Sequence, residues 1–221
     1  MRIILLSLMI LLSCSTVITE PIVIKPIIEP VARKEVNLCS TIYYTPTLHY
    51  SASGIPVRDK SGKVLSRLSS KDFCALAMEG SGYIKRDGKA ELFNWDGTGE
   101  GKDTACNHSP SSYGRFYIDS THPYGVGNRD NPLIPFYSVA CDQKIYKYGQ
   151  RLFIPGAKGV ILPSGKVHDG YFRCDDVGGK IKSNHIDTFI GLSNDWANDN
   201  PFKYAKGCKY PKHNFKAYLV N

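Results

Sequence analysis

Short apolar runs recur along residues 39–221, and Gly, Pro, Asn or Asp interrupts them at intervals of about ten residues. Evenly spaced, strand-like segments of this kind are typical of a β-barrel or a β-sandwich. The pattern therefore predicts a mainly β fold for this part of the chain. The expected strands are residues 41–45, 83–85, 91–94, 115–118, 135–140, 152–155, 171–174, 186–190 and 215–220.

One segment, residues 71–78, has the spacing of a short helix instead of a strand. Its apolar side chains share one face, which indicates that this face packs into the core. Ser69 or Ser70 can cap the beginning of the helix, and Gly80 follows its end, as is common at helix termini. We therefore expect one short helix in a fold that otherwise consists of strands and peripheral loops.

The amino-terminal segment has the pattern of an export signal. Arg2 precedes a predominantly apolar run, residues 3–12, which is too short to span a bilayer comfortably. The run ends in Leu-Leu-Ser-Cys, which resembles a bacterial lipoprotein box and makes residues 1–13 the expected signal peptide. Cys14 would then be acylated and would anchor the protein to a membrane. In the alternative, the signal peptide is an ordinary one and this cysteine is incidental.

Residues 14–38 are expected to form an extended tether between the anchor and the folded domain. Three prolines interrupt an Ile- and Val-rich stretch that lacks helical periodicity, and proline-rich spacers remain extended. The remaining residues, 39–221, are numerous enough for one domain with a sizeable core. Because Ser15 follows the cysteine, we expect an exported, periplasmic protein that is anchored to the outer membrane.

The seven cysteines agree with export. Setting Cys14 aside leaves an even number, which in an exported domain indicates three disulfides. The sequence does not determine how they pair, and a zinc site is disfavoured because no C-x-x-C pair occurs. We expect no bound metal. The disulfide candidates are Cys39, Cys74, Cys106, Cys141, Cys174 and Cys208.

The net charge of +8 is spread along the chain without a run of five basic residues. This distribution disfavours a nucleic-acid-binding stripe, so we expect no nucleic-acid partner. A basic exported protein is better suited to an anionic surface, such as peptidoglycan or the acidic polymers of a cell wall. The glycine-rich segment 97–104 lacks the spacing of a phosphate-binding loop, so we expect no cofactor. We also expect the protein to be a monomer.

Three aspartates surround a glycine turn within residues 168–191, and a fourth precedes them. Asp175 and Asp176 come just before the turn, Asp187 follows it, and Asp142 lies upstream. Several acids on neighbouring strands are what acid/base chemistry on a sugar bond requires. Asp175 has the pattern of a simple turn residue, whereas Asp187 lies inside an apolar strand, where aspartate is disfavoured. A residue that breaks a local rule in this way is a candidate for function.

The same segment resembles the carboxyl-terminal signature of the membrane-bound lytic transglycosylase A family and its three-aspartate (3D) relatives. The matching residues are Asp176, Gly178, Gly179, Ile181, Lys182, Asp187, Phe189 and Gly191. Residues 139–142 and 149–154 resemble the family's strand with its first aspartate, and residues 78–84 resemble its Gly-Ser-Gly strand. Ser183 departs from the pattern, because the family usually has glycine at this position.

The resemblance implies a six-stranded double-psi β-barrel that cleaves the glycan strands of peptidoglycan. Asp187 would protonate the β-1,4 bond between N-acetylmuramic acid and N-acetylglucosamine, and would then assist closure of a 1,6-anhydro ring. Asp176 and Asp142 would raise the pKa of Asp187, because neighbouring carboxylates resist ionising together. In chain order the matching blocks are residues 78–84, 139–154 and 176–191. The stretch between the second and third blocks is too short for the large inserted domain of the family. The substrate cleft of this protein would therefore be shallower than that of the family.

Several residues are expected on the substrate side of the barrel. By the resemblance, Ser81, Gly82 and Lys182 are the polar contacts. His185 is two residues from Asp187, so in a strand it would share the face of that acid, where it would bind substrate or tune the acid. Alternatively, His185 is a partly exposed polar residue that has no role in binding or catalysis. The aromatic candidates for stacking on sugar rings are Tyr43, Tyr44, Tyr83, Tyr113, Tyr117, Trp95 and Trp196.

Cys141 and Cys174 each directly precede an aspartate of the signature, so a bridge between them would hold two acid-bearing strands together. Two other functions remain open: a barrel that binds peptidoglycan without turnover, and a hydrolase of another β-glycan. A hydrolase would need a second carboxylate to direct water. The sequence also leaves open whether cleavage is exo or endo and which glycan length is preferred.

Overall fold

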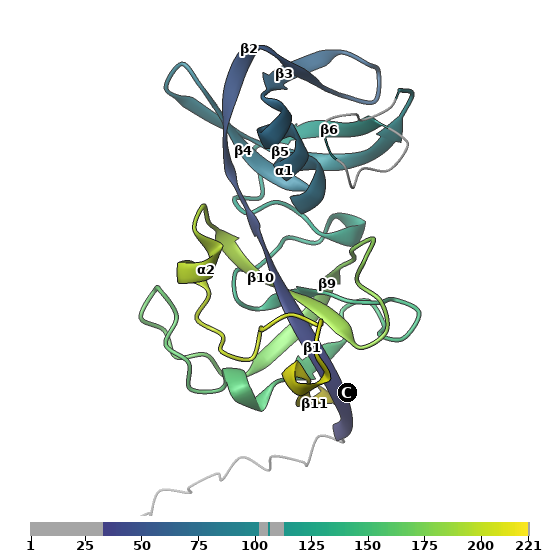
Figure 1. Ribbon diagram of the computed structural model, residues 1–221, viewed down its shortest axis with the longest axis vertical. Helices are drawn as coiled ribbons and strands as arrows, with labels where there is room; N and C mark the ends of the chain where they lie inside the picture. Colours follow the sequence, from purple (N-terminus) through teal and green to yellow (C-terminus); the bar gives the residue numbers. More distant parts are fainter. Residues whose placement is uncertain (1–32, 102–105, 107–112, 221) are drawn as a thin grey trace, which may run out of the picture. The chain divides into compact units, whose positions relative to one another are not determined.

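The computed structural model describes residues 33–101, 106 and 113–220 (Figure 1). The expected signal peptide, Cys14 and the expected tether up to residue 32 lie outside the described residues. The first strand begins at Arg33, so residues 33–38 of the expected tether are part of the folded domain. Within the described residues, no helix is both long enough and apolar enough to cross a membrane.

Six strands close into a barrel, which confirms the expected mainly β fold class. They are β1 Arg33–Thr45, β7 Ser138–Ala140, β8 Arg151–Phe153, β9 Tyr171–Asp176, β10 His185–Leu192 and β11 Phe215–Val220. Around the barrel their order is β1, β10, β7, β9, β8 and β11. The pairs β1–β10 and β7–β9 are parallel, whereas the others are antiparallel.

The alternation of side chains along β10 separates the barrel core from the outer face. Ile186 and Thr188 are fully buried, whereas His185 and Asp187 are only partly buried. Successive side chains of a strand point to opposite faces, so these two polar residues share the face away from the core. The core consists mainly of aliphatic and aromatic side chains, and its largest fully buried members are Leu38, Leu152, Ile154, Phe172, Ile186 and Phe202.

A second sheet of five strands is inserted between β1 and β7 in the sequence. Its strands are β2 Thr47–Arg58, β3 Val64–Leu68, β4 Ser81–Arg86, β5 Lys89–Gly99 and β6 Tyr113–Asp119. Their order is β3, β2, β4, β5 and β6, with an additional pairing of β2 with β6. The sheet has its own apolar core, in which Phe73, Phe93 and Phe116 are almost fully buried.

This sheet differs from the expectation of a single barrel over residues 39–221 without an inserted domain. The strands expected near residues 83–85, 91–94 and 115–118 exist, but they belong to the second sheet. Strands β2 and β3 were not expected. The sequence of β2 contains Gly54 and Pro56, which normally disfavour strand interiors, and its pairing with β3 shifts register near these residues.

The expected helix is α1, Ser70–Glu79, and its ends agree with the sequence. The Ser69 side chain accepts a hydrogen bond from the backbone N–H of Asp72 at 3.1 Å. Gly80 has a φ of 77°, in the left-handed region that favours glycine, and closes the helix. The fold also contains short helical turns that the sequence did not predict: α2 Trp196–Asp199, η1 Asn128–Asp130, η2 Pro155–Ala157 and η3 Pro211–His213.

Three disulfides connect the six candidate cysteines. The pairs are Cys39–Cys208, Cys74–Cys106 and Cys141–Cys174. The expected Cys141–Cys174 bridge is therefore confirmed, and it links the residue after β7 to β9. The bridge from Cys39 joins β1 to the segment before β11 and encloses a sequence separation of 169 residues.

We expect the double substitution Cys39→Ala, Cys208→Ala to lower the free energy of unfolding by about 3–5 kcal/mol, because this bridge restricts a very long loop in the unfolded chain. Denaturant unfolding of the oxidised protein, followed by tryptophan fluorescence, measures the difference. The matched control is the wild type under reducing conditions, which should lose at least as much stability. Identical unfolding midpoints for the variant and the oxidised wild type would contradict this expectation.

Candidate functional site

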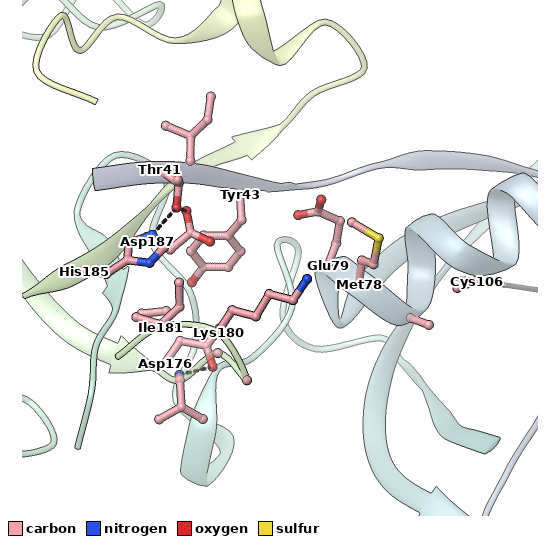
Figure 2. A pocket seen from close by; sticks show the side chains of 16 residues that line it. Thr41, Tyr43, Met78, Glu79, Cys106, Asp176, Lys180, Ile181, His185 and Asp187 are labelled. Carbon is pink, nitrogen blue, oxygen red and sulfur yellow. Dashed lines mark hydrogen bonds between the residues drawn. The ribbon is translucent and has the colours of Figure 1, made fainter. Parts of the chain in front are cut away.

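A cavity of about 490 Å³ brings two of the expected acids together with residues from distant parts of the chain (Figure 2). Thr41 and Tyr43 line it from β1, and His185 and Asp187 line it from β10. Asp176 and the connection that follows β9 supply another wall. The end of helix α1 completes the lining, so both the barrel and the helix that packs against the second sheet contribute to this cavity.

The parallel pairing of β1 with β10 places Thr41 directly beside Asp187. Thr41 Oγ1 donates a hydrogen bond to Asp187 Oδ1 at 2.7 Å, and His185 Nε2 lies 2.7 Å from the same hydroxyl oxygen. The three side chains form a hydrogen-bonded row in the cavity wall (Figure 2). This row restricts the orientation of the Asp187 carboxyl, as a group that transfers protons requires.

Burial raises the pKa of Asp187 to about 6. The hydrogen bond from Thr41 opposes this shift, and the charge of Asp176 adds to it. A carboxyl with this pKa keeps its proton in a useful fraction of molecules near neutral pH. It can therefore act as a general acid where an ordinary aspartate would be almost fully ionised.

Asp176 ends β9 and is fixed by the backbone around it. One carboxylate oxygen, Oδ1, accepts hydrogen bonds from the N–H groups of Val177 at 2.8 Å and Asn128 at 3.1 Å. Burial nevertheless raises the pKa of Asp176 to about 6. Because both acids resist ionisation in the same cavity, their titrations depend on each other.

Tyr43 accompanies these two acids in the cavity lining. Only 8% of the residue is exposed, and burial together with the charges of Asp176 and Asp187 raises the pKa of its phenol well above the ordinary value. The hydroxyl lies near Asp176 but does not reach hydrogen-bond geometry, so within the described residues it has no partner. Buried hydroxyls without a partner are rare in folded proteins, so Tyr43 is a candidate for a role in this site.

Asp142 has a different position from the other two acids of the signature. It is not among the residues that line the cavity, and its carboxylate accepts hydrogen bonds from the N–H groups of Ser183 at 2.8 Å and Lys144 at 3.1 Å. These bonds lower its pKa. Ser183, where the resembled family usually has glycine, has a left-handed φ of 59°. Asp142 thus holds the loop before β10 and does not line the cavity with Asp187.

Asp175 is also outside the cavity, and the structure places it in a buried polar cluster instead of a simple turn. Its carboxylate contacts Arg173 Nε at 2.5 Å and accepts a hydrogen bond from Ser138 Oγ at 2.7 Å. These partners compensate the buried charge. Asp175 therefore connects β9 to β7 within the barrel.

Of the residues expected to contact substrate, His185 lines the cavity, but Ser81, Gly82 and Tyr83 do not. Ser81 is buried and donates a hydrogen bond to Asn94 Oδ1 at 2.7 Å. The Tyr83 hydroxyl donates to the Pro123 carbonyl at 2.9 Å. Gly82 lies where a side chain would collide with Leu48 and Leu76. All three are on β4, where they connect and pack the second sheet. Lys182 is exposed outside the cavity, and Lys180 lines it instead.

Among the cavity residues that sequence reasoning did not single out are Thr41 and Glu79. Thr41 has no distinguishing signal, because a threonine in a strand is common. Glu79 has one: it is an acid at the carboxyl end of a helix, where the helix dipole disfavours negative charge. Gly178, which the signature did include, is explained by the structure, because a side chain there would collide with Ile181.

Comparisons with known proteins agree with this architecture. Residues 137–200 match the family described as the 3D domain, and this range contains Asp142, Asp176 and Asp187. A comparison with curated proteins finds no similar sequence. The expected relationship to the three-aspartate proteins is therefore confirmed for the carboxyl-terminal part of the chain, including β7, β9 and β10.

Solved structures that are similar in fold include the following three. MltA of E. coli with bound chitohexaose is 19% identical over 84% of this chain and 72% of that chain, with a TM-score of 0.60. A membrane-bound lytic murein transglycosylase from Agrobacterium tumefaciens is 13% identical over 85% and 76%, with a TM-score of 0.61. MltA from Neisseria gonorrhoeae is 15% identical over 84% and 73%, with a TM-score of 0.55. At these identities the likeness shows the fold, and its extent includes the second sheet.

The raised pKa of Asp187 predicts a pH-dependent effect on stability. In the unfolded chain this acid ionises near pH 3.8, whereas in the folded protein it ionises near pH 6. The free energy of unfolding therefore falls as the pH rises from about 3.8 to about 6, and it stays lowered at higher pH. Asp187→Asn removes this loss. We expect the variant to have the same free energy of unfolding as the wild type near pH 4 and to be about 1–3 kcal/mol more stable near pH 7.5.

Denaturant unfolding at both pH values tests this expectation. Asp169→Asn is the matched control, because Asp169 is exposed and its side chain caps the Tyr171 N–H in a way that asparagine can reproduce. The control should show no such pH dependence. A loss of stability at pH 7.5, or an equal gain at both values, would contradict the assignment of a raised pKa to Asp187.

Proposed function

We propose that this protein is a lytic transglycosylase that cleaves the β-1,4 bond between N-acetylmuramic acid and N-acetylglucosamine in peptidoglycan. The observation that carries the proposal is the environment of Asp187, which orients its carboxyl group and raises its pKa. This acid is oriented by Thr41, lines a cavity large enough for sugar groups, and has a pKa of about 6. The likeness in fold to MltA of E. coli, whose structure contains chitohexaose, supports a glycan as the ligand.

In the proposed reaction, the protonated carboxyl of Asp187 donates its proton to the glycosidic oxygen as the bond from that oxygen to C1 of the muramic acid breaks. The oxygen of the 6-hydroxyl group on the same sugar then forms a bond to C1. The proton of that hydroxyl returns to the Asp187 carboxylate, which restores the acid. The product carries a 1,6-anhydro ring, and no water is consumed.

The environment of Asp187 supports turnover over binding alone. A site that only binds neutral sugars gains nothing from two buried acids whose ionisation is suppressed, and burying such groups costs stability. Unfavourable, strongly perturbed acids in a cavity are characteristic of catalytic sites. Asp176 acts on the pKa of Asp187 in this proposal, whereas Asp142 supports the loop that precedes β10.

Export to the cell envelope is consistent with the three disulfides, because such bonds form and persist in oxidising compartments. We propose in addition that Cys14 carries the lipid that holds the protein at the outer membrane. The glycan strands of peptidoglycan would then be the partner within reach of the folded domain.

Asp187→Asn tests the proposed reaction, because asparagine keeps the shape of the side chain and can still accept the hydrogen bond from Thr41. We expect turnover of purified peptidoglycan to fall by at least the factor of about 10²–10⁴ that general acid–base catalysis contributes, whereas binding to insoluble peptidoglycan persists. Asp176→Asn should reduce turnover less. Mass spectrometry of the released muropeptides measures both the rate and the product.

Asp169→Asn is again the matched control and should cleave at the wild-type rate. Release of 1,6-anhydro-muropeptides by the wild type supports the proposal, and release of reducing ends indicates a hydrolase instead. If the wild type binds peptidoglycan without cleaving it, the protein is a glycan-binding module and not an enzyme. Equal turnover by the wild type and Asp187→Asn would remove Asp187 from the mechanism.

Mass spectrometry of the mature protein from intact cells tests the anchor. We expect an amino-terminal Cys14 that bears acyl chains and a protein that sediments with membranes, because acylation adds apolar surface that partitions into lipid. Cys14→Ala should abolish acylation and move the protein out of the membrane fraction. A soluble wild-type form that begins downstream of Cys14 would contradict the anchor without affecting the proposed reaction.

A further inference from the structure

Tyr43 is a polar residue of the cavity to which the proposed reaction gives no task. Its side chain comes from β1, and only 8% of the residue is exposed. The hydroxyl oxygen is buried and, within the described residues, has no hydrogen-bond partner. A buried hydroxyl in this state has lost its bonds to water without replacement, which costs stability. Such groups are rare, so its retention beside two acids calls for a functional explanation.

Packing fixes the direction of the Tyr43 side chain. Its ring lies against the ring of Phe189, with centroids 5.0 Å apart, and the two residues are paired between β1 and β10. The other buried members of this apolar cluster are Leu133, Ala140 and Ile181. Figure 2 shows the hydroxyl end of the ring directed away from β1, toward the side of the cavity that contains Asp176. The ring therefore has little freedom to carry its hydroxyl elsewhere.

Titratable groups face the cavity from every element that lines it. Besides Tyr43 they are His185 and Asp187 on β10, Asp176 and Lys180 at the end of β9 and after it, and Glu79 at the end of α1. Burial and the negative charges of Asp176, Asp187 and Asp175 raise the pKa of the Tyr43 phenol. The phenol keeps its proton over the whole range in which these acids ionise. It can therefore donate a hydrogen bond to them but cannot act as a base.

Asp176 needs donors more than Asp187 does. Burial raises its pKa, and three donors oppose the rise: the N–H groups of Val177 and Asn128, and the Tyr43 hydroxyl nearby. Both N–H groups bind Oδ1, so within the described residues the second oxygen, Oδ2, accepts no hydrogen bond. Asp187 accepts one hydrogen bond, from Thr41. Donors of this kind favour the ionised form of a carboxyl.

The two acids compete for a proton. Each has a pKa of about 6, and the charge of Asp176 acts on Asp187, so near this pH the pair carries about one proton. With the Tyr43 hydroxyl present, neither acid holds that proton strongly in preference to the other. Without it, Asp176 would lose one of its three donors and would take the proton. Asp187 would then be ionised and unable to act as the acid.

Building on the proposed function, we propose that Tyr43 is a positioning residue that keeps the shared proton available to Asp187, because its hydroxyl donates a hydrogen bond to the ionised Asp176. The active form has Asp187 protonated and Asp176 ionised. The negative charge of Asp176 then also favours the positive charge that develops on the sugar as the glycosidic bond breaks. Tyr43 itself transfers no proton, and Asp187 remains the single acid of the reaction.

The test uses Tyr43→Phe in the full-length protein, with Tyr137→Phe as the matched control. The Tyr137 hydroxyl is also buried without a partner within the described residues, but Tyr137 does not line the cavity. Each variant removes one unpaired hydroxyl and keeps the ring, so both should have a Tm equal to or above that of the wild type. Binding to insoluble peptidoglycan should persist in both.

The pH dependence of kcat/KM on peptidoglycan separates proton placement from structural damage. A lost hydrogen bond to a charged group changes the distribution of the proton by about ten-fold, so Tyr43→Phe should be about five-fold slower near pH 6. Near pH 8 it should approach the wild-type rate, because both acids are then mostly ionised and the hydroxyl no longer affects which of them is protonated. Its optimum therefore moves to higher pH, whereas Tyr137→Phe keeps the wild-type profile.

An equal loss at both pH values, or no loss at pH 6, would overturn the role of Tyr43 and leave the proposed function intact. A double-mutant cycle adds a second criterion. In the Asp176→Asn background there is no second acid to take the proton, so Tyr43→Phe should have no further effect on the pH profile. An undiminished effect in that background would also overturn the inference.

Titration of side-chain carboxyls by ¹³C NMR tests the inference without turnover, with the Asp176→Asn and Asp187→Asn variants to assign the two signals. Near pH 6, Tyr43→Phe should move the Asp176 signal toward its protonated position and the Asp187 signal toward its ionised position. Tyr137→Phe should move neither. Unchanged signals in Tyr43→Phe would contradict the inference. If these shifts occur but the wild type cleaves nothing, the proposed function is wrong, whereas control of the proton by Tyr43 is supported.

Discussion

The site depends on the parallel pairing of β1 with β10. This pairing sets Thr41 opposite Asp187 and Tyr43 opposite Phe189, whose rings pack with their centroids 5.0 Å apart. Because side chains alternate along a strand, a shift of one residue would turn Asp187 into the apolar core and bring Ile186 to the cavity. Such a shift would bury an unpaired acid, so the hydrophobic pattern of β10 and the position of the acid specify the same register.

Barrel closure keeps that register from changing. Strand β1 also pairs with β11 along residues 33–38, and the Cys39–Cys208 bridge joins it to the segment before β11. On the other side, β10 pairs with β7, and the Cys141–Cys174 bridge connects the end of β7 to β9. A closed ring with cross-links at two places offers little freedom for relaxation. It can therefore hold Asp187 and Asp176 close together although their charges repel.

Helix α1, which packs against the second sheet, extends the site beyond the barrel wall. Strand β1 ends at Thr45 and β2 begins at Thr47, so the chain passes from one sheet into the other almost without a turn. Inside the second sheet, Asn94 connects Ser81 to Asp119 through hydrogen bonds of 2.7 Å. This buried network fixes β4 next to β5 and β6. The polar Gly-Ser-Gly strand thus supports the position of α1, whose last residue reaches the cavity.

The sequence by itself determined the mainly β class, the helix over residues 71–78 with a cap at Ser69 or Ser70 and with Gly80 after its end, and the number of disulfides. It also singled out Asp187, which lines the cavity, because an acid inside an apolar strand contradicts local propensity. These features depend on residue type and on neighbours within a few positions. The Cys141–Cys174 pair was expected only from the resemblance, because each cysteine precedes an aspartate of the signature, and the other two pairings came from the structure.

Only the tertiary structure decided which polar residues share the cavity. Asp142 and Asp187 belong to one signature, yet the Ser183 and Lys144 N–H groups bind Asp142 away from the cavity. Glu79 and Thr41 lie far from the signature in sequence and beside it in space. The sequence also did not predict which strands belong to the barrel and which to the second sheet. Strand pairing and cavity lining arise from contacts between segments that are distant in the sequence. The local periodicity of one sequence does not determine which of these segments come into contact.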